Sequence, residues 1–319
     1  MKFNIQCVRG NQARLGYLAE VGCHGNKTLE TPLCMLYTKG GSAPYITAEV
    51  LKKLQDVPSM AHMPLNQVAS FQETIAGFKD GIAKFAALDN QLVYTSNNDP
   101  AVEVPTGYNT KTGIGLWGKG GKTQLDCEGY IQCIEAMIPD WFQSMSDADT
   151  DSTSTNKRAG KAVERTIKFL DLILENLKTS KTLEKSVLFG SIVGGYDMGA
   201  RKKCICETVA RNVQGFVLEG FHRLGPSTED FDIKQHSDFI SNIIKLLPDD
   251  APRLMHNVWR PDSILIAIEL GIDVFDSSYP LYMLKFILSL GCGAEISMLN
   301  FEYCDLDSIP SDCWSYILT

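Results

Sequence analysis

The fold of this chain follows from the stretch at residues 252–280, PRLMHNVWRPDSILIAIELGIDVFDSSYP. Residues 254–258 form a short, largely apolar run between two prolines, which predicts a buried strand. Apolar residues at helical spacing then lead to Gly271, a typical helix terminator, and residues 272–275 predict a second buried strand. The stretch is therefore a β-α-β unit with Asp276 at the carboxyl end of a strand, where parallel α/β folds place their reactive groups.

Strand and helix candidates alternate along most of the chain. The other strand candidates are residues 33–37, 92–94, 141–145, 187–193 and 215–218. Helical segments are expected at residues 163–177, 201–213, 237–247 and 263–270. Such sustained alternation predicts a parallel sheet, and an eight-stranded (β/α) TIM-type barrel is its economical closure. A doubly wound open sheet is the alternative architecture.

The segments outside this alternation suggest how the chain is divided. Residues 3–21 alternate apolar and polar side chains, which predicts a β-hairpin or a small leading sheet. Residues 65–85 predict an amphipathic helix or helix pair, and the Ser/Thr/Asp-rich residues 148–155 predict a long solvated loop. The expected units are an N-terminal β extension at residues 1–30, the barrel at 31–290 and a tail at 291–319.

Composition restricts the class of protein. The 319 residues are enough for one large barrel, and the net charge of -8 makes the chain a poor nucleic-acid binder on its own. The N-terminus lacks the apolar core of a secretory signal, and no apolar run reaches the length of a membrane span. The ten scattered cysteines are therefore expected to be reduced thiols in the cytoplasm. The pair Cys204 and Cys206 has no further ligands at zinc-site spacing, so no metal site is predicted there.

Several residues are candidates for a site, and each also has a structural interpretation. Asp276 and Asp147 both follow strands, where aspartate often only caps a helix or forms a turn. Gly194 and Gly195 follow a strand and would let a planar ligand approach the backbone, or would simply form a tight turn. The best basic cluster comprises Arg158, Lys161, Arg165 and Lys168, which are expected to form a solvated helix face.

Three motifs give the chain a resemblance to a known family. They are GIDVFD at residues 271–276, FGSIVGG at residues 189–195 and GFVLEG at residues 215–220. Together they resemble the tRNA-guanine transglycosylase family. The resemblance implies that Asp276 stands at the position of the nucleophile, which forms a covalent glycosyl intermediate on ribose. It also implies that Gly194, Gly195 and Gly220 line a guanine pocket whose base edge is read by Asp147.

Two departures point to the non-catalytic branch of that family. Ser96 stands where catalytic members carry the aspartate that moves the proton of the exchanged base, and Val193 stands where they carry a base-recognising glutamine. Base exchange needs both a nucleophile and a proton carrier, so no catalytic residue is expected here and Asp276 is interpreted as vestigial. Further motifs resemble the accessory subunits of eukaryotic queuine tRNA-ribosyltransferases; they are RLG at residues 14–16, LYTKGGSAP at 36–44, PDWFQ at 139–143 and RPD at 260–262.

This resemblance implies a partner and a process. The chain would pair with a catalytic queuine tRNA-ribosyltransferase subunit in a heterodimer, which exchanges guanine for queuine at the wobble position of tRNAs with GUN anticodons. Contact with tRNA would be made through the complex. The resemblance further implies a cytoplasmic location, with peripheral association at the mitochondrial outer membrane as an option.

The family also carries a zinc site after the barrel, built from a Cys-x-Cys-x-x-Cys motif and a later histidine. Cys292, Cys304 and Cys313 lack that spacing and the last histidine is His256, so no zinc or other cofactor is expected in this chain. We expect either a shortened form or a lineage that lost the zinc segment.

Two alternatives to the accessory role remain open. One is an active transglycosylase with Asp276 as nucleophile and another proton carrier, such as Asp99. The other is a truncated relic that binds neither partner.

Overall fold

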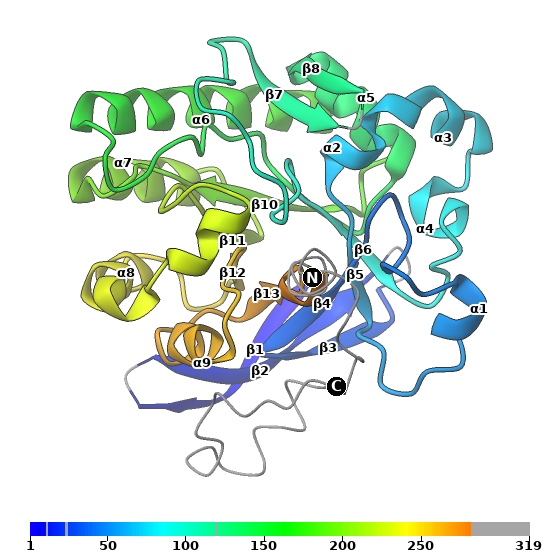
Figure 1. The fold of residues 1–319 in the computed structure, drawn as a ribbon, viewed down its shortest axis with the longest axis horizontal. Coiled ribbons are helices and arrows are strands. Elements are labelled where there is room, and N and C mark those ends of the chain that lie inside the picture. The colour runs from blue at the N-terminus through cyan, green and yellow to red at the C-terminus, as the bar shows by residue number, and fades with distance from the viewer. Residues whose placement is uncertain (11, 23–24, 119, 282–319) are drawn as a thin grey trace, which may run out of the picture.

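The computed structural model describes residues 1–10, 12–22, 25–118 and 120–281, and its centre is a closed barrel of parallel strands (Figure 1). The barrel strands are β4 (Leu33–Tyr37), β5 (Met60–His62), β6 (Leu92–Thr95), β9 (Trp141–Gln143), β10 (Val187–Ile192), β11 (Gly215–Leu218), β12 (Arg253–Met255) and β13 (Val274–Asp276). Strand β13 pairs with β4 and closes the ring. The predicted TIM-type barrel is confirmed, and the open sheet is excluded because the ring has no edge strand.

Helices lie around the outside of the barrel (Figure 1). The longer ones are α5 (Cys127–Met137), α6 (Asn156–Leu177), α7 (Met198–Val209), α8 (Ser237–Ile244) and α9 (Pro261–Glu269). Short 3-10 helices, η2 (Pro226–Asp230) and η3 (Ile233–His236), precede α8. The two-stranded hairpin of β7 (Gly113–Gly118) and β8 (Gly121–Asp126) follows β6.

The region between β4 and β6 is more broken than its periodicity predicts. It contains α1 (Ala48–Leu51), α2 (Leu65–Val68), η1 (Ala69–Phe71), α3 (Gln72–Phe78) and α4 (Gly81–Phe85). The expected helix or helix pair at residues 65–85 is therefore a series of short helices. Lys79 adopts a left-handed conformation with φ of 70°, and Gly81 adopts φ of 77°, so the backbone turns between α3 and α4.

Strand β5 has no counterpart among the strands predicted from the sequence. It consists of Met-Ala-His, is fully buried, and pairs in parallel with both β4 and β6. A three-residue strand is too short to show alternation, and none of its residues is β-branched or a bulky aromatic, the usual sequence signals of a strand. The segment is a strand because it pairs with both neighbouring strands of the barrel, β4 and β6.

The N-terminal residues form the expected leading sheet. Strands β1 (Lys2–Arg9), β2 (Ala13–Val21) and β3 (Lys27–Thr31) pair in antiparallel order. Leu18, Val21 and Leu29 of this sheet belong to the same buried cluster as barrel-interior residues such as Trp141 and Phe189. The sheet therefore covers the amino-terminal end of the barrel, away from the carboxyl ends of the strands, and leaves that other end available for a site.

A buried ion pair fixes this sheet to the barrel. Arg14 on β2 donates to both carboxylate oxygens of Asp273, with its Nε lying 3.1 Å from Oδ1, and the two side chains are 3% and 0% exposed. Arg14 also donates to the carbonyls of Asp249 and Ala251, and Asp273 accepts the backbone N–H of Arg253 at 2.7 Å. Both charges are thus satisfied by several hydrogen bonds, as burial of an ion pair requires.

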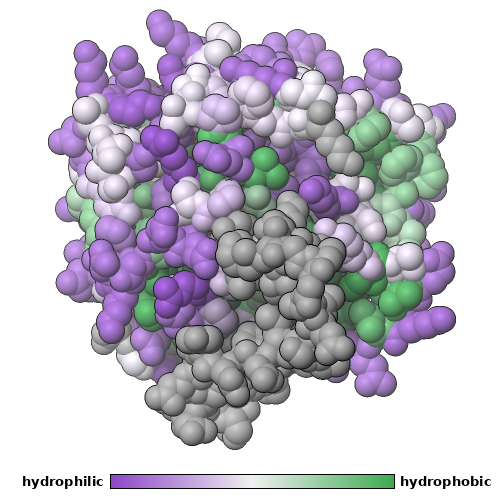
Figure 2. Space-filling view, viewed as in Figure 1, coloured by the Kyte–Doolittle hydropathy of each residue, from purple (hydrophilic) through white to green (hydrophobic). Residues whose placement is uncertain are grey.

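One face of the molecule also carries exposed apolar side chains. Figure 2 shows hydrophilic side chains over most of this face and apolar ones gathered toward its right-hand side, in the region of α1, α3 and α4. Val50, Phe78 and Phe85 on these helices are 47%, 45% and 44% exposed, and the two phenylalanine rings meet edge to face at 5.5 Å. None of the described helices is long and apolar enough to cross a membrane.

Replacing Arg14 by methionine tests the role of the buried pair. Arg14→Met preserves most of the side-chain volume but leaves the Asp273 carboxylate buried without its cation. We expect the free energy of unfolding, measured by urea titration, to fall by about 3–5 kcal/mol. Lys2→Met in the same sheet is the control, since Lys2 and Glu20 form an exposed pair and their separation should change little. Equal losses in both variants would contradict a special role for Arg14.

Candidate functional site

A cavity of about 440 Å³ lies at the carboxyl ends of the barrel strands. It is bordered by loops that follow β6, β9, β11 and β12, which contribute, among others, Asn98, Tyr108, Ser146, Asp149, Thr150, Glu219, His222, His256 and Asn257. The cavity therefore lies at the end of the barrel where the sequence places the candidate site, and its wall is rich in polar groups.

The three candidate glycines differ in their relation to this cavity. Gly220 borders it, has φ of 74°, and a Cβ added there would lie 2.5 Å from Thr150 Oγ1, which donates to the Gly220 carbonyl. Gly194 and Gly195 are not among the residues that border it. A Cβ added to Gly194 would lie 2.9 Å from the amide nitrogen of Arg201, so this glycine allows helix α7 to pack closely against the strand-to-helix turn. Ligand binding by any of the three remains a prediction.

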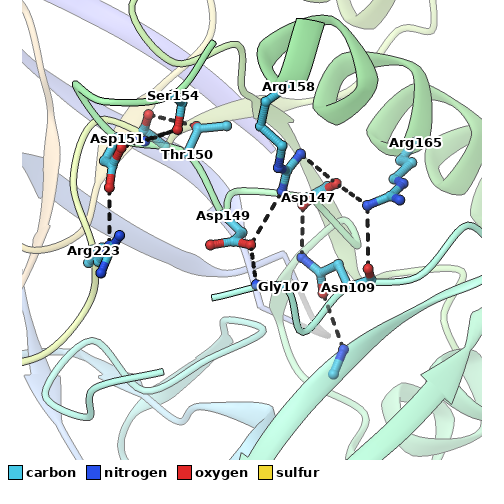
Figure 3. Close-up of polar contacts among 12 residues, drawn as sticks. Gly107, Asn109, Asp147, Asp149, Thr150, Asp151, Ser154, Arg158, Arg165 and Arg223 are labelled. Atoms are coloured by element: carbon cyan, nitrogen blue, oxygen red, sulfur yellow. Dashed lines mark hydrogen bonds and ion pairs between the residues drawn. The ribbon is translucent and has the colours of Figure 1, made fainter. Parts of the chain in front are cut away.

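Asp147 is the centre of an ion-pair cluster (Figure 3). Arg158 and Arg165 on α6 both point toward its carboxylate, and Asn109 reaches it from the segment between β6 and β7. Arg158 Nη2 lies 2.7 Å from Oδ1 and Nη1 lies 3.0 Å from Oδ2, while Arg165 Nη1 lies 2.8 Å from Oδ2. The side chain of Asp147 is 0% exposed and does not border the cavity. Its predicted contact with a base is therefore not available in this conformation and stays a prediction.

The helix face that carries these arginines was expected to be solvated. That expectation is wrong for Arg158 and Arg165, whose side chains are 27% and 26% exposed because they turn in toward Asp147. Lys161 and Lys168 are exposed as predicted. Periodicity identifies which residues lie outside the apolar stripe of a helix, but it contains no information about a carboxylate in the loop after another strand.

The same cluster holds two loops together. Asp149 accepts the backbone N–H of Gly107 at 2.7 Å, and Arg165 donates to the carbonyl of Asn109 at 3.3 Å (Figure 3). Residues 148–155 form a loop, as predicted, but only part of it is solvated. Thr150 is 4% exposed, and this loop forms one wall of the cavity because it is held against the segment after β6 and against Gly220.

The electrostatics of Asp147 favour its charged form. Burial alone would raise the pKa of this carboxyl, but hydrogen bonds from Arg158 and the charge of that side chain outweigh burial and lower the pKa below its usual value of 3.8. Asp147 is therefore an ionised carboxylate whose oxygens are occupied by donors from the protein itself.

Asp276, which the sequence resemblance places at the position of the family nucleophile, is also enclosed. The residue is 3% exposed; its Oδ2 accepts the backbone N–H of Asn257 at 2.6 Å, and its Oδ1 accepts the N–H of Ser278 at 3.0 Å together with the Ser278 hydroxyl. Burial raises the pKa of this carboxyl. Asp276 does not border the cavity, and both of its oxygens already have donors.

Ser96, at the position of the missing proton carrier, and Asp99, the alternative carrier, also have hydrogen-bond partners within the protein. Ser96 Oγ lies 2.7 Å from His62 Nε2 and donates to the carbonyl of Asn98. Asp99 accepts the Tyr37 hydroxyl at 2.8 and 2.9 Å and the backbone N–H of Ala101 at 2.9 Å, and burial raises its pKa. Asp99 is not among the residues that border the cavity, although its neighbours Asn98 and Pro100 are. Val193, which the sequence resemblance places where catalytic members carry a base-recognising glutamine, is fully buried in an apolar cluster.

Two histidines within the barrel were missed by the sequence analysis. The rings of His62 and His256 stack at 5.3 Å, and the Tyr94 hydroxyl lies 3.2 Å from His256 Nε2. Burial lowers the pKa of His62 well below its usual value and that of His256 to about 4, so both rings are neutral at physiological pH. His256 borders the cavity. A histidine in a largely apolar strand pattern was the available signal, but only the closed ring brings these two together.

No metal site is apparent in the part of the chain that the structure describes. Within it, no group of three or more His, Cys, Asp or Glu side chains is placed to hold a metal ion. Cys292, Cys304 and Cys313 lie outside the described residues. The absence of a cofactor remains a prediction.

The family is identified by comparison with known proteins. The model of the queuine tRNA-ribosyltransferase family matches residues 7–317. The chain belongs to this family. A Xenopus tropicalis protein called queuine tRNA-ribosyltransferase accessory subunit 2 is 40% identical over 281 residues, which are 88% of this chain and 66% of that protein.

Other relatives carry the same name. The Ixodes scapularis protein is 37% identical over 87% of this chain and 71% of its own length, and the Homo sapiens protein is 35% identical over 92% and 68%. The chain thus spans about two thirds of the length of these relatives, and slightly less for the Xenopus tropicalis protein. The family predicted from the motifs around Asp276, Gly194 and Gly220 is confirmed.

Replacing Asp147 by asparagine tests the ion-pair cluster. Because the pKa of Asp147 is lowered in the folded state, its contribution to stability is complete above 3.8, its usual value, and is lost as the pH falls through the folded-state pKa. We expect Asp147→Asn to lower the free energy of unfolding by about 2 kcal/mol at neutral pH, since hydrogen bonds to charged groups are lost. The difference from wild type should shrink under acidic conditions.

The measurement is a series of denaturant titrations at descending pH. Asp171→Asn is the control, because Asp171 forms a more exposed pair with Arg211 and should show a smaller difference at neutral pH. A difference between wild type and Asp147→Asn that stays constant into acid would contradict the assignment of an ionised Asp147.

Proposed function

We propose that this chain is a non-catalytic subunit of queuine tRNA-ribosyltransferase, which supports the exchange of guanine for queuine at the wobble position of tRNAs with GUN anticodons. One observation carries the proposal. The barrel of the family is intact, yet Asp276, at the nucleophile position, is enclosed by donors from Asn257 and Ser278 and lies apart from the cavity. The names of the relatives, which call them accessory subunits, support the same role.

The serine at position 96, where the resemblance places the family's proton-carrying aspartate, supports the proposal. Ser96 cannot exchange a proton as a carboxyl does, and Asp99, which does not border the cavity, already accepts hydrogen bonds from Tyr37 and Ala101. Base exchange needs a proton carrier within hydrogen-bonding reach of the departing base. A subunit with this arrangement would depend on another subunit for the chemistry.

The expected partner is a catalytic queuine tRNA-ribosyltransferase subunit, in a heterodimer. The exposed apolar side chains Val50, Phe78 and Phe85 form the kind of surface that proteins commonly use to bind other proteins. Contact with tRNA would be made through the complex, because a net charge of -8 disfavours autonomous binding to a phosphate backbone. A cytoplasmic location is part of this proposal.

Base exchange on a queuine-accepting tRNA tests the proposed function. Incorporation of labelled queuine would be measured with this chain alone, with the catalytic subunit from the same organism alone, and with the two mixed. We expect incorporation only in the mixture. The Asp276→Asn variant should support the mixture as well as wild type does, provided that its thermal unfolding shows a folded protein.

Two results would overturn the proposal. Incorporation by this chain alone, abolished in Asp276→Asn, would identify an active transglycosylase that opens the enclosed carboxylate. A mixture no more active than the catalytic subunit alone, with no complex detected by analytical ultracentrifugation, would show that the chain binds no such partner.

A further inference from the structure

Arg158 belongs both to the cavity wall and to the ion pair with Asp147. It is one of the residues that border the cavity, and its guanidinium forms a bidentate pair with Asp147. Arg165 approaches the same carboxylate through a single nitrogen, Nη1, and does not border the cavity. Arg158 therefore stands between the cavity and the buried carboxylate, with 27% of its side chain exposed.

The hydrogen-bonding pattern of Arg158 and Asp147 determines which ligands cannot bind the Asp147 carboxylate. A guanidinium presents two parallel N–H donors to the two oxygens of a carboxylate. The base edge of guanine, with its N1–H and N2–H groups, presents the same pattern of two adjacent donors in a plane. A carboxylate has about four lone-pair sites. On Asp147, Arg158 fills two of these sites and Asn109 and Arg165 fill one each, so none is left for a guanine edge while the fork is in place.

We propose that Arg158 acts as an internal occupant of Asp147 and thereby closes the cavity to planar ligands that carry two adjacent N–H donors, of which guanine is the type. The contact is autoinhibitory, because the group that would select such a ligand is held by a side chain of the same molecule. This inference concerns the cavity of the isolated chain and is independent of whether the chain pairs with a catalytic subunit.

Asp147 is placed so that removal of the Arg158 fork would bring its carboxylate next to the cavity. Its neighbours in sequence, Ser146 and Ala148, both border the cavity. Without the fork of Arg158, the carboxylate would lie next to that wall with only Asn109 and Arg165 as side-chain partners. These two donors would still compensate the charge, so the carboxylate would be freed on one side without being left buried and unpaired.

The fork also has an advantage over any ligand in solution. Arg158 and Asp147 belong to one chain, so their contact is intramolecular and has the effective concentration of a tethered group. A free ligand with the same donor pattern must compete with that contact as well as pay the cost of association. Removing the fork should therefore reveal affinity that the wild-type protein does not show.

The experiment measures binding of radiolabelled guanine by equilibrium dialysis, with hypoxanthine as the second probe because it lacks the 2-amino donor. The proteins are the full chain as wild type, Arg158→Met, the matched control Arg165→Met, and the double variant Arg158→Met with Asp147→Asn. We expect Arg158→Met to bind guanine at least about tenfold more tightly than wild type. Hypoxanthine binding should change little, because it lacks the 2-amino donor that would pair with the freed Asp147 carboxylate. Arg165→Met and the double variant should show no gain.

Each other outcome overturns the inference. No gain in Arg158→Met means that the fork does not hold the cavity closed. An equal gain in Arg165→Met means that charge, rather than occupancy by the fork, is what matters. A gain that persists in the double variant means that guanine binds elsewhere.

A second variant keeps the test decisive if Arg158→Met does not fold. Arg158→Lys retains the positive charge near Asp147 but loses the planar fork. We expect Arg158→Lys to gain less affinity for guanine than Arg158→Met would. Its affinity should still be at least about threefold higher than that of wild type and of Arg165→Lys. Binding equal to that of wild type would overturn the inference.

Discussion

The buried ion pair between Arg14 and Asp273 is the constraint on which the rest of the molecule depends. Asp273 directly precedes β13, the strand that closes the barrel against β4, and it also accepts a hydrogen bond from the backbone of Arg253 on β12. Arg14 belongs to the N-terminal sheet. One carboxylate thus connects the sheet that covers the barrel with two of the strands that complete it. Because neither charge reaches solvent, the pair tolerates only the geometry in which all these hydrogen bonds are made.

The two ends of the barrel are stabilised in different ways. At the covered end, apolar side chains of β2 and β3 join the interior cluster of the barrel, so burial of apolar surface provides most of the stabilisation. At the open end, loops are held by polar contacts, chiefly those of Asp147 with Arg158, Arg165 and Asn109. Polar contacts depend on direction, so they determine which groups face the cavity as well as how firmly the loops are held.

The side chains at the three positions that the family resemblance marks as functional share one property, which is that the protein itself supplies their partners. Asp276 is satisfied by backbone and side-chain donors, Asp147 by two arginines, and Ser96 by His62. A catalytic carboxylate or base needs a lone pair that is free to act on its substrate. The proposed accessory role and the proposed occupancy of Asp147 are two consequences of this same feature: the family's fold is kept while its reactive positions are occupied internally.

The sequence by itself determined the architecture and the family. Strand-helix alternation, the strand end at Asp276 and the leading sheet all depend on local pattern, which can be recognised from neighbouring residues alone. Tertiary structure alone decided that Met60–His62 is a strand, because its place is set by β4 and β6 rather than by its own residues. It also decided that Arg158 and Arg165 face a carboxylate instead of water, and that His62 and His256 stack. These contacts form between different segments of the chain, and the packing of several loops determines them. The periodicity of one segment does not encode the charge that another segment places against it.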